Sequence, residues 1–188
     1  TRVQGSSALL LQDCAPNAQH VKLVFPARDN MPKVAMPEVE VHWYDGGMMP
    51  DRPEGFPQGK ELMGEGGGLC IFHGTKDTLI CGCYGVNPWL LSGRKPNVPQ
   101  TLRRVKDAMK GGHEQDWIRA CKESAGSRVQ TKSNFLEAGP FNEMVVMGVL
   151  AVRLQRLNKE LLWDGPNMRF TNIDPNETIK IIKKDTFE

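Results

Sequence analysis

The chain has 188 residues, a hydrophobic fraction of 39%, a charged fraction of 24% and a net charge of +2. These values are ordinary for a globular domain, and without a clustered basic excess a nucleic-acid partner is not expected. No uninterrupted apolar run approaches the roughly 18 residues that cross a bilayer, so we expect no membrane span.

The first part of the chain predicts three strands. Two are expected at residues 7–12 and 20–25, and the third is Val39–Tyr44, in which apolar and polar residues alternate. This period of two indicates a strand with one buried face. An Asp-Gly-Gly turn at residues 45–47 ends the third strand, because glycine accepts positive φ at little cost.

The middle of the chain predicts a hairpin and a short helix. A long irregular segment at residues 48–66 is typical of functional or mobile loops. The hairpin is expected at residues 69–73 and 78–84, with a tight turn between its strands. The short helix is expected at residues 113–124.

The last third predicts a buried helix at residues 143–157, capped by Asn142, and short strands at 161–163 and 168–170. A further helix start is expected at residues 174–177. Strands come first, and helices mixed with strands follow without βαβ alternation. This order predicts an α+β fold with an open, largely antiparallel or mixed sheet and helices on one face.

Several side chains could carry chemistry. Trp43, Tyr44 and Asp45 place two aromatic rings and a carboxylate at a strand end, as sugar sites often do, although plain turns look the same. Asp116 and Asp164 also border a tryptophan. His113 lies at a helix N-terminus, where the helix dipole favours a neutral imidazole that can bond a hydroxyl, the alternative being an ordinary surface residue.

The cysteines do not suggest a disulfide framework. Their count is five, an odd number, which favours buried, reduced thiols. Cys81 and Cys83 would share one face of a strand, and no second pair occurs at zinc-finger spacing. We therefore predict no metal site, and no catalytic serine or cysteine motif is found.

Several segments together resemble the C-terminal half of Gfo/Idh/MocA-type oxidoreductases, in the branch common in Bacteroidetes and Planctomycetes. The resemblance covers residues 22–177. The segments, in order, are Phe25–Arg28, Trp43–Gly47 followed by Pro50 and Pro53, the glycine-rich entry to the hairpin, His113–Trp117, Gly139–Glu143 with the apolar helix after it, and Leu162–Asp164 with Thr171 and Asn172.

The resemblance implies a two-domain enzyme. Its N-terminal Rossmann domain binds NAD or NADP, and its C-terminal α+β domain covers the substrate and makes oligomer contacts. Such enzymes transfer a hydride between nicotinamide and a carbon of a sugar, cyclitol or related polyol. The family's catalytic lysine, in a Glu-Lys-Pro motif, and its His/Asp pair lie before the segment that matches residue 1, and no such motif is present here.

Residues 1–188 are therefore expected to be a single substrate and oligomerisation domain, inert without its own Rossmann domain, with no catalytic residue and no cofactor of its own. The opening segment lacks an initiator Met, which also suggests a piece of a longer protein. The resemblance suggests a bacterial protein that is cytoplasmic or exported to the periplasm by a twin-arginine signal. The residues expected near a sugar-like substrate are Arg28, Trp43, Tyr44, Asp45 and His113.

Two other functions stay open. A non-catalytic carbohydrate-binding or scaffold module would bind a sugar by itself. An NAD-dependent glycosidase would use the same redox step to cleave a glycoside.

Overall fold

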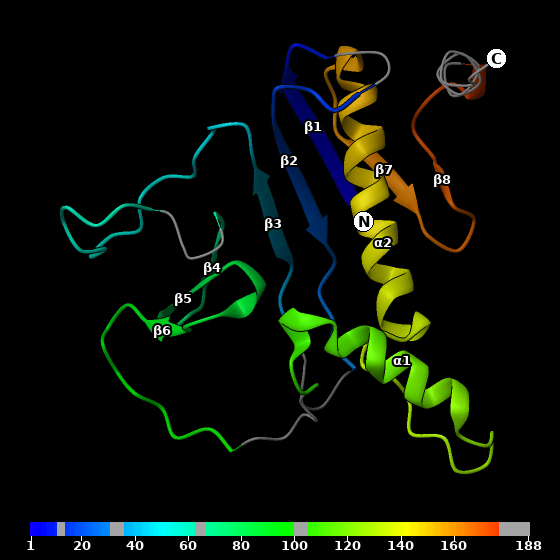
Figure 1. Cartoon of the computed structure of the whole chain (residues 1–188). Helices are drawn as coiled ribbons and strands as arrows, with labels where there is room; N and C mark the ends of the chain where they lie inside the picture. The colour runs from blue at the N-terminus through cyan, green and yellow to red at the C-terminus, as the bar shows by residue number, and fades with distance from the viewer. Residues whose placement is uncertain (11–13, 31–35, 63–66, 100–104, 177–188) are drawn as a thin grey trace. The chain divides into compact units, whose positions relative to one another are not determined.

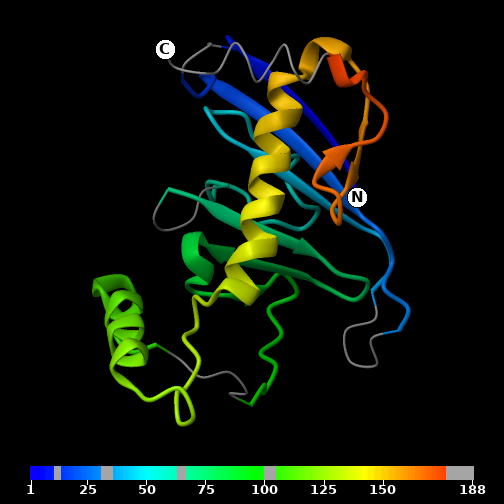
Figure 2. The same cartoon turned by 90° about the vertical axis from the view of Figure 1, so that its right-hand side faces the viewer.

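A computed structural model describes residues 1–10, 14–30, 36–62, 67–99 and 105–176 of the chain (Figures 1 and 2). The chain divides into two compact units, one of Thr1–Met49 with Val105–Glu188 and one of Pro50–Arg104. Each unit has its own sheet and its own hydrophobic core. The assignment of the whole chain to a single domain stays a prediction.

The first unit contains a five-stranded sheet in the order β3-β2-β1-β7-β8, in which all neighbours are antiparallel. The strands are β1 (Arg2–Ala8), β2 (Ala18–Phe25), β3 (Val39–Tyr44), β7 (Leu161–Asp164) and β8 (Arg169–Phe170). With two α-helices beside antiparallel sheets, the predicted α+β class with an open sheet is confirmed.

The first strand does not lie where it was predicted. It occupies Arg2–Ala8, and Leu9 leaves the strand with a φ of 55°. Residues 11 and 12 of the predicted strand 7–12 lie outside the described residues. The strand was misplaced because Gln4, Gly5 and Ser6 do not alternate between apolar and polar residues, so the sequence carries no period-2 signal there.

The core of the first unit lies between the sheet and α2 (Phe135–Arg153). Alternate residues of β1 and β2 face the helix, among them Val3, Val21 and Leu23, which are at most 4% exposed. Each aliphatic side chain buried in this way contributes about 1.5–3 kcal/mol. Figures 1 and 2 show α2 running along β1 and β2.

Two glycines let the helix approach the sheet closely. A Cβ on Gly5 would lie 2.6 Å from the backbone nitrogen of Val152, and one on Gly148 would lie 3.3 Å from Cγ1 of Val21. The close approach explains why Gly5 stands in the middle of a strand, where glycine otherwise weakens the sheet.

Helix α2 begins eight residues before the predicted start at Glu143. Its N-cap is Asn134, whose Oδ1 accepts from the backbone nitrogens of Leu136 and Glu137 at 2.9 and 3.3 Å. Asn142, which was predicted to cap the helix, lies inside it. The prediction was wrong because Asn142 is also a capping residue type and directly precedes the apolar stretch. Pro140 lies in the second turn of the helix, where a proline removes a single helical hydrogen bond.

By length and composition, α2 is the one helix among the described residues that could cross a membrane. Its mean hydropathy is 1.4, and 22% of its apolar stretch is buried. The core helices of globular proteins can be equally long and apolar, and this helix packs on β1 and β2. The expected absence of a membrane span stays a prediction.

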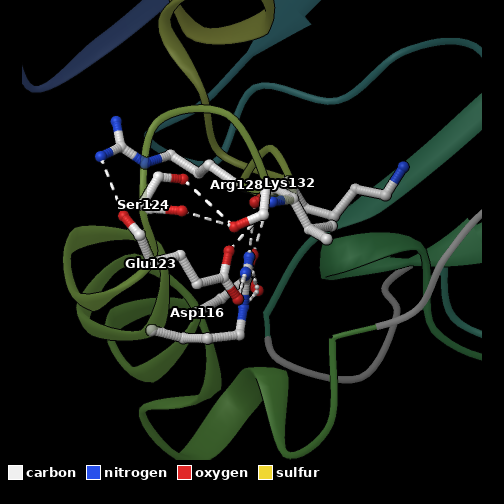
Figure 3. Close-up of polar contacts among 8 residues, drawn as sticks. Asp116, Glu123, Ser124, Arg128 and Lys132 are labelled. Atoms are coloured by element: carbon white, nitrogen blue, oxygen red, sulfur yellow. Dashed lines mark hydrogen bonds and ion pairs between the residues drawn. The ribbon is translucent and has the colours of Figure 1, made fainter.

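Helix α1 (Gly112–Lys122) is joined to the segment before α2 by hydrogen bonds of Arg119 and Asp116; Figure 3 shows this network, with Asp116 of the helix and Lys132 of the segment labelled. The guanidinium of Arg119 donates to Asp116 and Glu123 and to the carbonyl of Val129. Asp116 also accepts from the backbone nitrogen of Lys132 at 3.1 Å, and its side chain is 5% exposed. The segment between the two helices has no regular secondary structure, and these contacts fix it in place.

The second unit is a three-stranded antiparallel sheet in the order β4-β5-β6. The strands are β4 (Leu69–His73), β5 (Thr78–Gly82) and β6 (Trp89–Leu90), so the predicted hairpin is confirmed, with its second strand ending at Gly82. Phe56, Leu62 and Ile80 form its core.

The other helical segments in the described ranges are short 3-10 turns at Cys83–Gly85, Ala108–Lys110 and Gln155–Leu157. The helix predicted to start at residues 174–177 lies partly outside the described residues. Within them, Asp174 Oδ1 accepts from the backbone nitrogen of Asn176 at 2.9 Å, as a cap would.

Candidate functional site on the open face of the sheet

The end of β3 is fixed by Asp45. Its Oδ1 accepts from the backbone nitrogen of Gln19 at 3.0 Å, and its Oδ2 accepts from Gln19 Nε2 at 2.8 Å and from Trp43 Nε1 at 2.9 Å. The backbone nitrogen of Asp45 donates in return to the carbonyl of Gln19 at 3.1 Å. Asp45 therefore ties the end of β3 to the start of β2.

Gly46 completes this turn in a conformation that only glycine can adopt without strain. Its φ is +64°, and a Cβ there would lie 2.0 Å from the carbonyl oxygen of Asn17 and 2.4 Å from Cα of Ala18. The turn consequently packs directly against the backbone that leads into β2.

This connection sets the register of β2 and β3, in which His20 pairs with Tyr44, Lys22 with His42 and Val24 with Glu40. Since Val21 and Leu23 face α2, the alternate side chains point to the opposite face, here called the open face. Five of them form what we call the histidine cluster: His20, Lys22, Glu40, His42 and Tyr44. All five are exposed or half-buried.

Polar contacts run through the histidine cluster in one continuous chain. Lys22 Nζ lies 3.0 Å from Glu40 Oε1, and the other oxygen of Glu40 lies 3.1 Å from His42 Nε2. His42 Nδ1 then lies 3.0 Å from His20 Nε2. An ionised carboxylate can only accept, so His42 Nε2 carries a proton and, in the neutral ring, Nδ1 accepts from His20.

Tyr44 packs on the last member of this chain. Its ring is stacked on that of His20, with centroids 4.5 Å apart and an angle of 10° between the planes. The two rings are directly opposed cross-strand neighbours, a position in which aromatic pairs stabilise a sheet. The contact restrains the imidazole of His20 in the orientation that faces His42.

Two pKa values in the cluster are displaced. Hydrogen bonds from Lys22 and then from His42 lower the pKa of Glu40. Burial first, and then the charges of His42 and Lys22, lower the pKa of His20. At neutral pH the cluster therefore combines a carboxylate, an ammonium group and a neutral His20 on one face.

The structure brings together three of the five residues predicted near a substrate. Trp43, Tyr44 and Asp45 share one strand end, but the rings of Trp43 and Tyr44 point to opposite faces of the sheet because they are consecutive in β3. Trp43 is 58% exposed.

Arg28 and His113 lie apart from this strand end. Arg28 forms an isolated bridge with Met36, and its guanidinium contacts the Met36 sulfur at 2.8 Å. His113 is exposed on the first turn of α1. Within the described ranges, no hydrogen bond, ion pair or ring contact joins either residue to Trp43, Tyr44 or Asp45. Their substrate-binding roles stay predictions.

Asp116 and Asp164, the other carboxylates beside tryptophans, have structural partners. Asp116 bonds Arg119 and the backbone of Lys132. Asp164 accepts from Asn167 Nδ2 at 2.8 Å and lies 3.8 Å from Arg169 in the turn between β7 and β8. Asp116 therefore joins α1 to the segment before α2, and Asp164 stabilises a local turn.

Sequence reasoning missed His20, Lys22, Glu40 and His42 as a group. The available signal was their position: each falls on the polar phase of its strand. Grouping them also requires the register of β2 against β3, which depends on the contact of Asp45 with Gln19.

No known protein-family model matches the chain, and no curated protein matches it. The family resemblance and the cofactor that it implies therefore stay predictions. In the part of the chain that the structure describes, no group of three or more His, Cys, Asp or Glu side chains is arranged to hold a metal ion.

Proposed function

We propose that this chain is the substrate-side domain of an NAD(P)-dependent oxidoreductase that acts on a sugar, cyclitol or related polyol. Its partners are its own N-terminal Rossmann domain, which binds NAD or NADP, and further copies of the chain. An open sheet with edge strands favours such self-association. Hydride transfer and proton transfer belong to the Rossmann half.

The histidine cluster is the observation that carries the proposal. Lys22 and the imidazoles can donate hydrogen bonds to hydroxyl groups, and Glu40 can accept them. The ring of Tyr44 supplies apolar surface beside these groups. A polyol needs this combination, because it presents hydroxyls and C–H bonds on one molecule.

The residues first expected near the substrate keep distinct roles in this proposal. Tyr44 contacts the polyol through the histidine cluster. Asp45 and Trp43 hold the strand end that positions Tyr44, and Arg28 and His113 contribute hydroxyl contacts from their own segments.

The test is hydride transfer by the protein translated from the complete natural coding sequence. Reduction of NAD⁺ and of NADP⁺ would be followed with a panel of sugars and cyclitols. The proposal expects turnover with at least one polyol and none with residues 1–188 alone. Sugar binding by residues 1–188 without any turnover of the whole protein would instead identify a binding module, and cleavage of aryl glycosides would identify a glycosidase.

A matched pair of variants tests the site, because the chain has two tyrosines. In the whole protein, Tyr44→Ala should raise the KM for the polyol about tenfold, equivalent to about 1.4 kcal/mol. The affinity for the nucleotide should not change. Tyr84→Ala, at a position 75% exposed in the second unit, should leave both constants near wild type. Equal changes in the two variants would contradict a substrate role for Tyr44.

A further inference from the structure

His20 and His42 present two ring nitrogens to each other on the open face, 3.0 Å apart. We propose that these two imidazoles form a binding site for a divalent transition-metal ion of the kind that imidazole prefers, with Zn²⁺ and Cu²⁺ as the principal candidates. The inference is independent of the proposed oxidoreductase function.

The separation of the two nitrogens suits a shared ion. Two histidine nitrogens at the usual metal distance of about 2.0–2.1 Å, subtending an angle between 90° and the tetrahedral value, lie about 2.9–3.4 Å apart. The observed 3.0 Å falls in this range. The rings are also nearly parallel, with an angle of 9° between their planes. The two nitrogens face each other along a hydrogen bond, so each ring has to turn in its plane by roughly 35–45° before both lone pairs point at one ion on the solvent side of the pair.

Glu40 sets the tautomer that His42 needs as a metal ligand. The carboxylate accepts from His42 Nε2 at 3.1 Å, which leaves the lone pair on Nδ1, the nitrogen that faces His20. A carboxylate on the far nitrogen of a metal-binding histidine fixes the tautomer and raises the basicity of the ligand. Lys22, at 3.0 Å from the other carboxylate oxygen, holds Glu40 in place.

The proton between the two rings has an alternative position. When an ion binds, the proton on His20 Nε2 moves to His20 Nδ1, so both rings remain neutral and both facing nitrogens are free to coordinate. Stacking on Tyr44 supports one face of the His20 ring while the ring turns in its plane. Since the described residues offer no third ligand in the same cluster, water completes the coordination and exchanges freely with the solvent.

The chain contains its own controls, because it has four histidines and the other two, His73 and His113, are exposed on other elements. We would titrate the ¹⁵N-labelled chain of residues 1–188 with Zn²⁺ and record the imidazole nitrogen spectra. The expected result is a saturable shift of His20 Nε2 and His42 Nδ1, with His73 and His113 unchanged. Zinc binding by the cysteines would not move these histidine signals.

Variants extend the test by calorimetry. His42→Ala should abolish the heat of Zn²⁺ binding at the two-histidine site. His113→Ala should leave that heat of binding unchanged. Glu40→Gln should weaken binding about tenfold, as expected for a group that orients a ligand. The proposal is overturned if excess Zn²⁺ leaves His20 and His42 unshifted, if all four histidines respond alike, or if His42→Ala binds as tightly as wild type. The spectra of the unaltered chain decide the question even where a variant fails to fold.

Discussion

Asp45 and Gly46 show how two residues can fix the pairing of two strands. The carboxylate of Asp45 accepts three hydrogen bonds, two from Gln19 and one from Trp43. Gly46 allows the turn to touch the backbone of Asn17 and Ala18. Both residues act at the point where the register of β2 and β3 is set, and the histidine cluster depends on that register.

Gly46→Ala should destabilise the fold more than Gly47→Ala. Both glycines have positive φ, but only at Gly46 would a Cβ collide with backbone, whereas at Gly47 no atom lies within 4 Å. The difference in the free energy of unfolding should be about 1–3 kcal/mol, the usual cost of overpacking. Chemical denaturation of the two variants measures it. Equal losses would show that the close contact at Asn17 does not constrain the turn.

At the scale of elements, α2 and the segment before it organise the first unit. The helix is capped by Asn134 and packs on β1 and β2 through Gly5 and Gly148. The segment before it is bonded to α1 through Arg119, which donates to the carbonyl of Val129. The start of α2 and the Arg119 contacts can be tested separately, because they involve different side chains.

Asn134→Ala should cost about 0.5–2 kcal/mol of stability, because it removes the side-chain acceptor for the first turn of α2. Asn142→Ala is the matched control. That position is inside the helix, where alanine is the better helix former, so its effect should be neutral or slightly stabilising. Thermal or denaturant unfolding distinguishes the two, and the reverse order would place the helix start at Asn142.

The ion pair of Arg119 and Glu123 should give a defined pH dependence. The hydrogen bond from Arg119, followed by one from the backbone nitrogen of Val129, lowers the pKa of Glu123. A carboxyl whose pKa is lower in the folded state stabilises the fold above its ordinary pKa of 4.5, and this contribution is lost as the pH falls through the folded value.

The free energies of unfolding of wild type and Glu123→Gln should therefore differ most at neutral pH. The gap between them should close as the pH falls below 4.5. Unfolding curves collected across that range provide the measurement. A gap that stays constant with pH would mean that the charge of Glu123 contributes nothing.

At the scale of the whole molecule, local sequence patterns predicted the class of the fold better than they predicted the contacts between residues. The alternation in Val39–Tyr44 and the turn between β4 and β5 are local signals, and both elements lie where they were predicted. The start of α2 was misplaced because Asn142 is also a capping residue type and precedes the apolar stretch, whereas the residue that caps the helix is Asn134.

The histidine cluster could not be predicted in the same way. His20 and His42 are far apart in the sequence, and their meeting depends on a register that no single strand encodes. Trp43 and Asp45 were recognised as notable, yet their mutual hydrogen bond and their contact with Gln19 are tertiary features. Composition and periodicity indicate which face a residue occupies, but they do not indicate which residue lies beside it.

The most direct test of the proposed function is nucleotide binding by the protein from the complete natural coding sequence. Titration with NADH and NADPH, followed by the fluorescence of the dihydronicotinamide, should show saturable binding of at least one of them. Residues 1–188 alone should bind neither. If the whole protein binds neither nucleotide, or if residues 1–188 bind one without a Rossmann domain, the assignment of this chain as the substrate-side half of an NAD(P)-dependent oxidoreductase is contradicted.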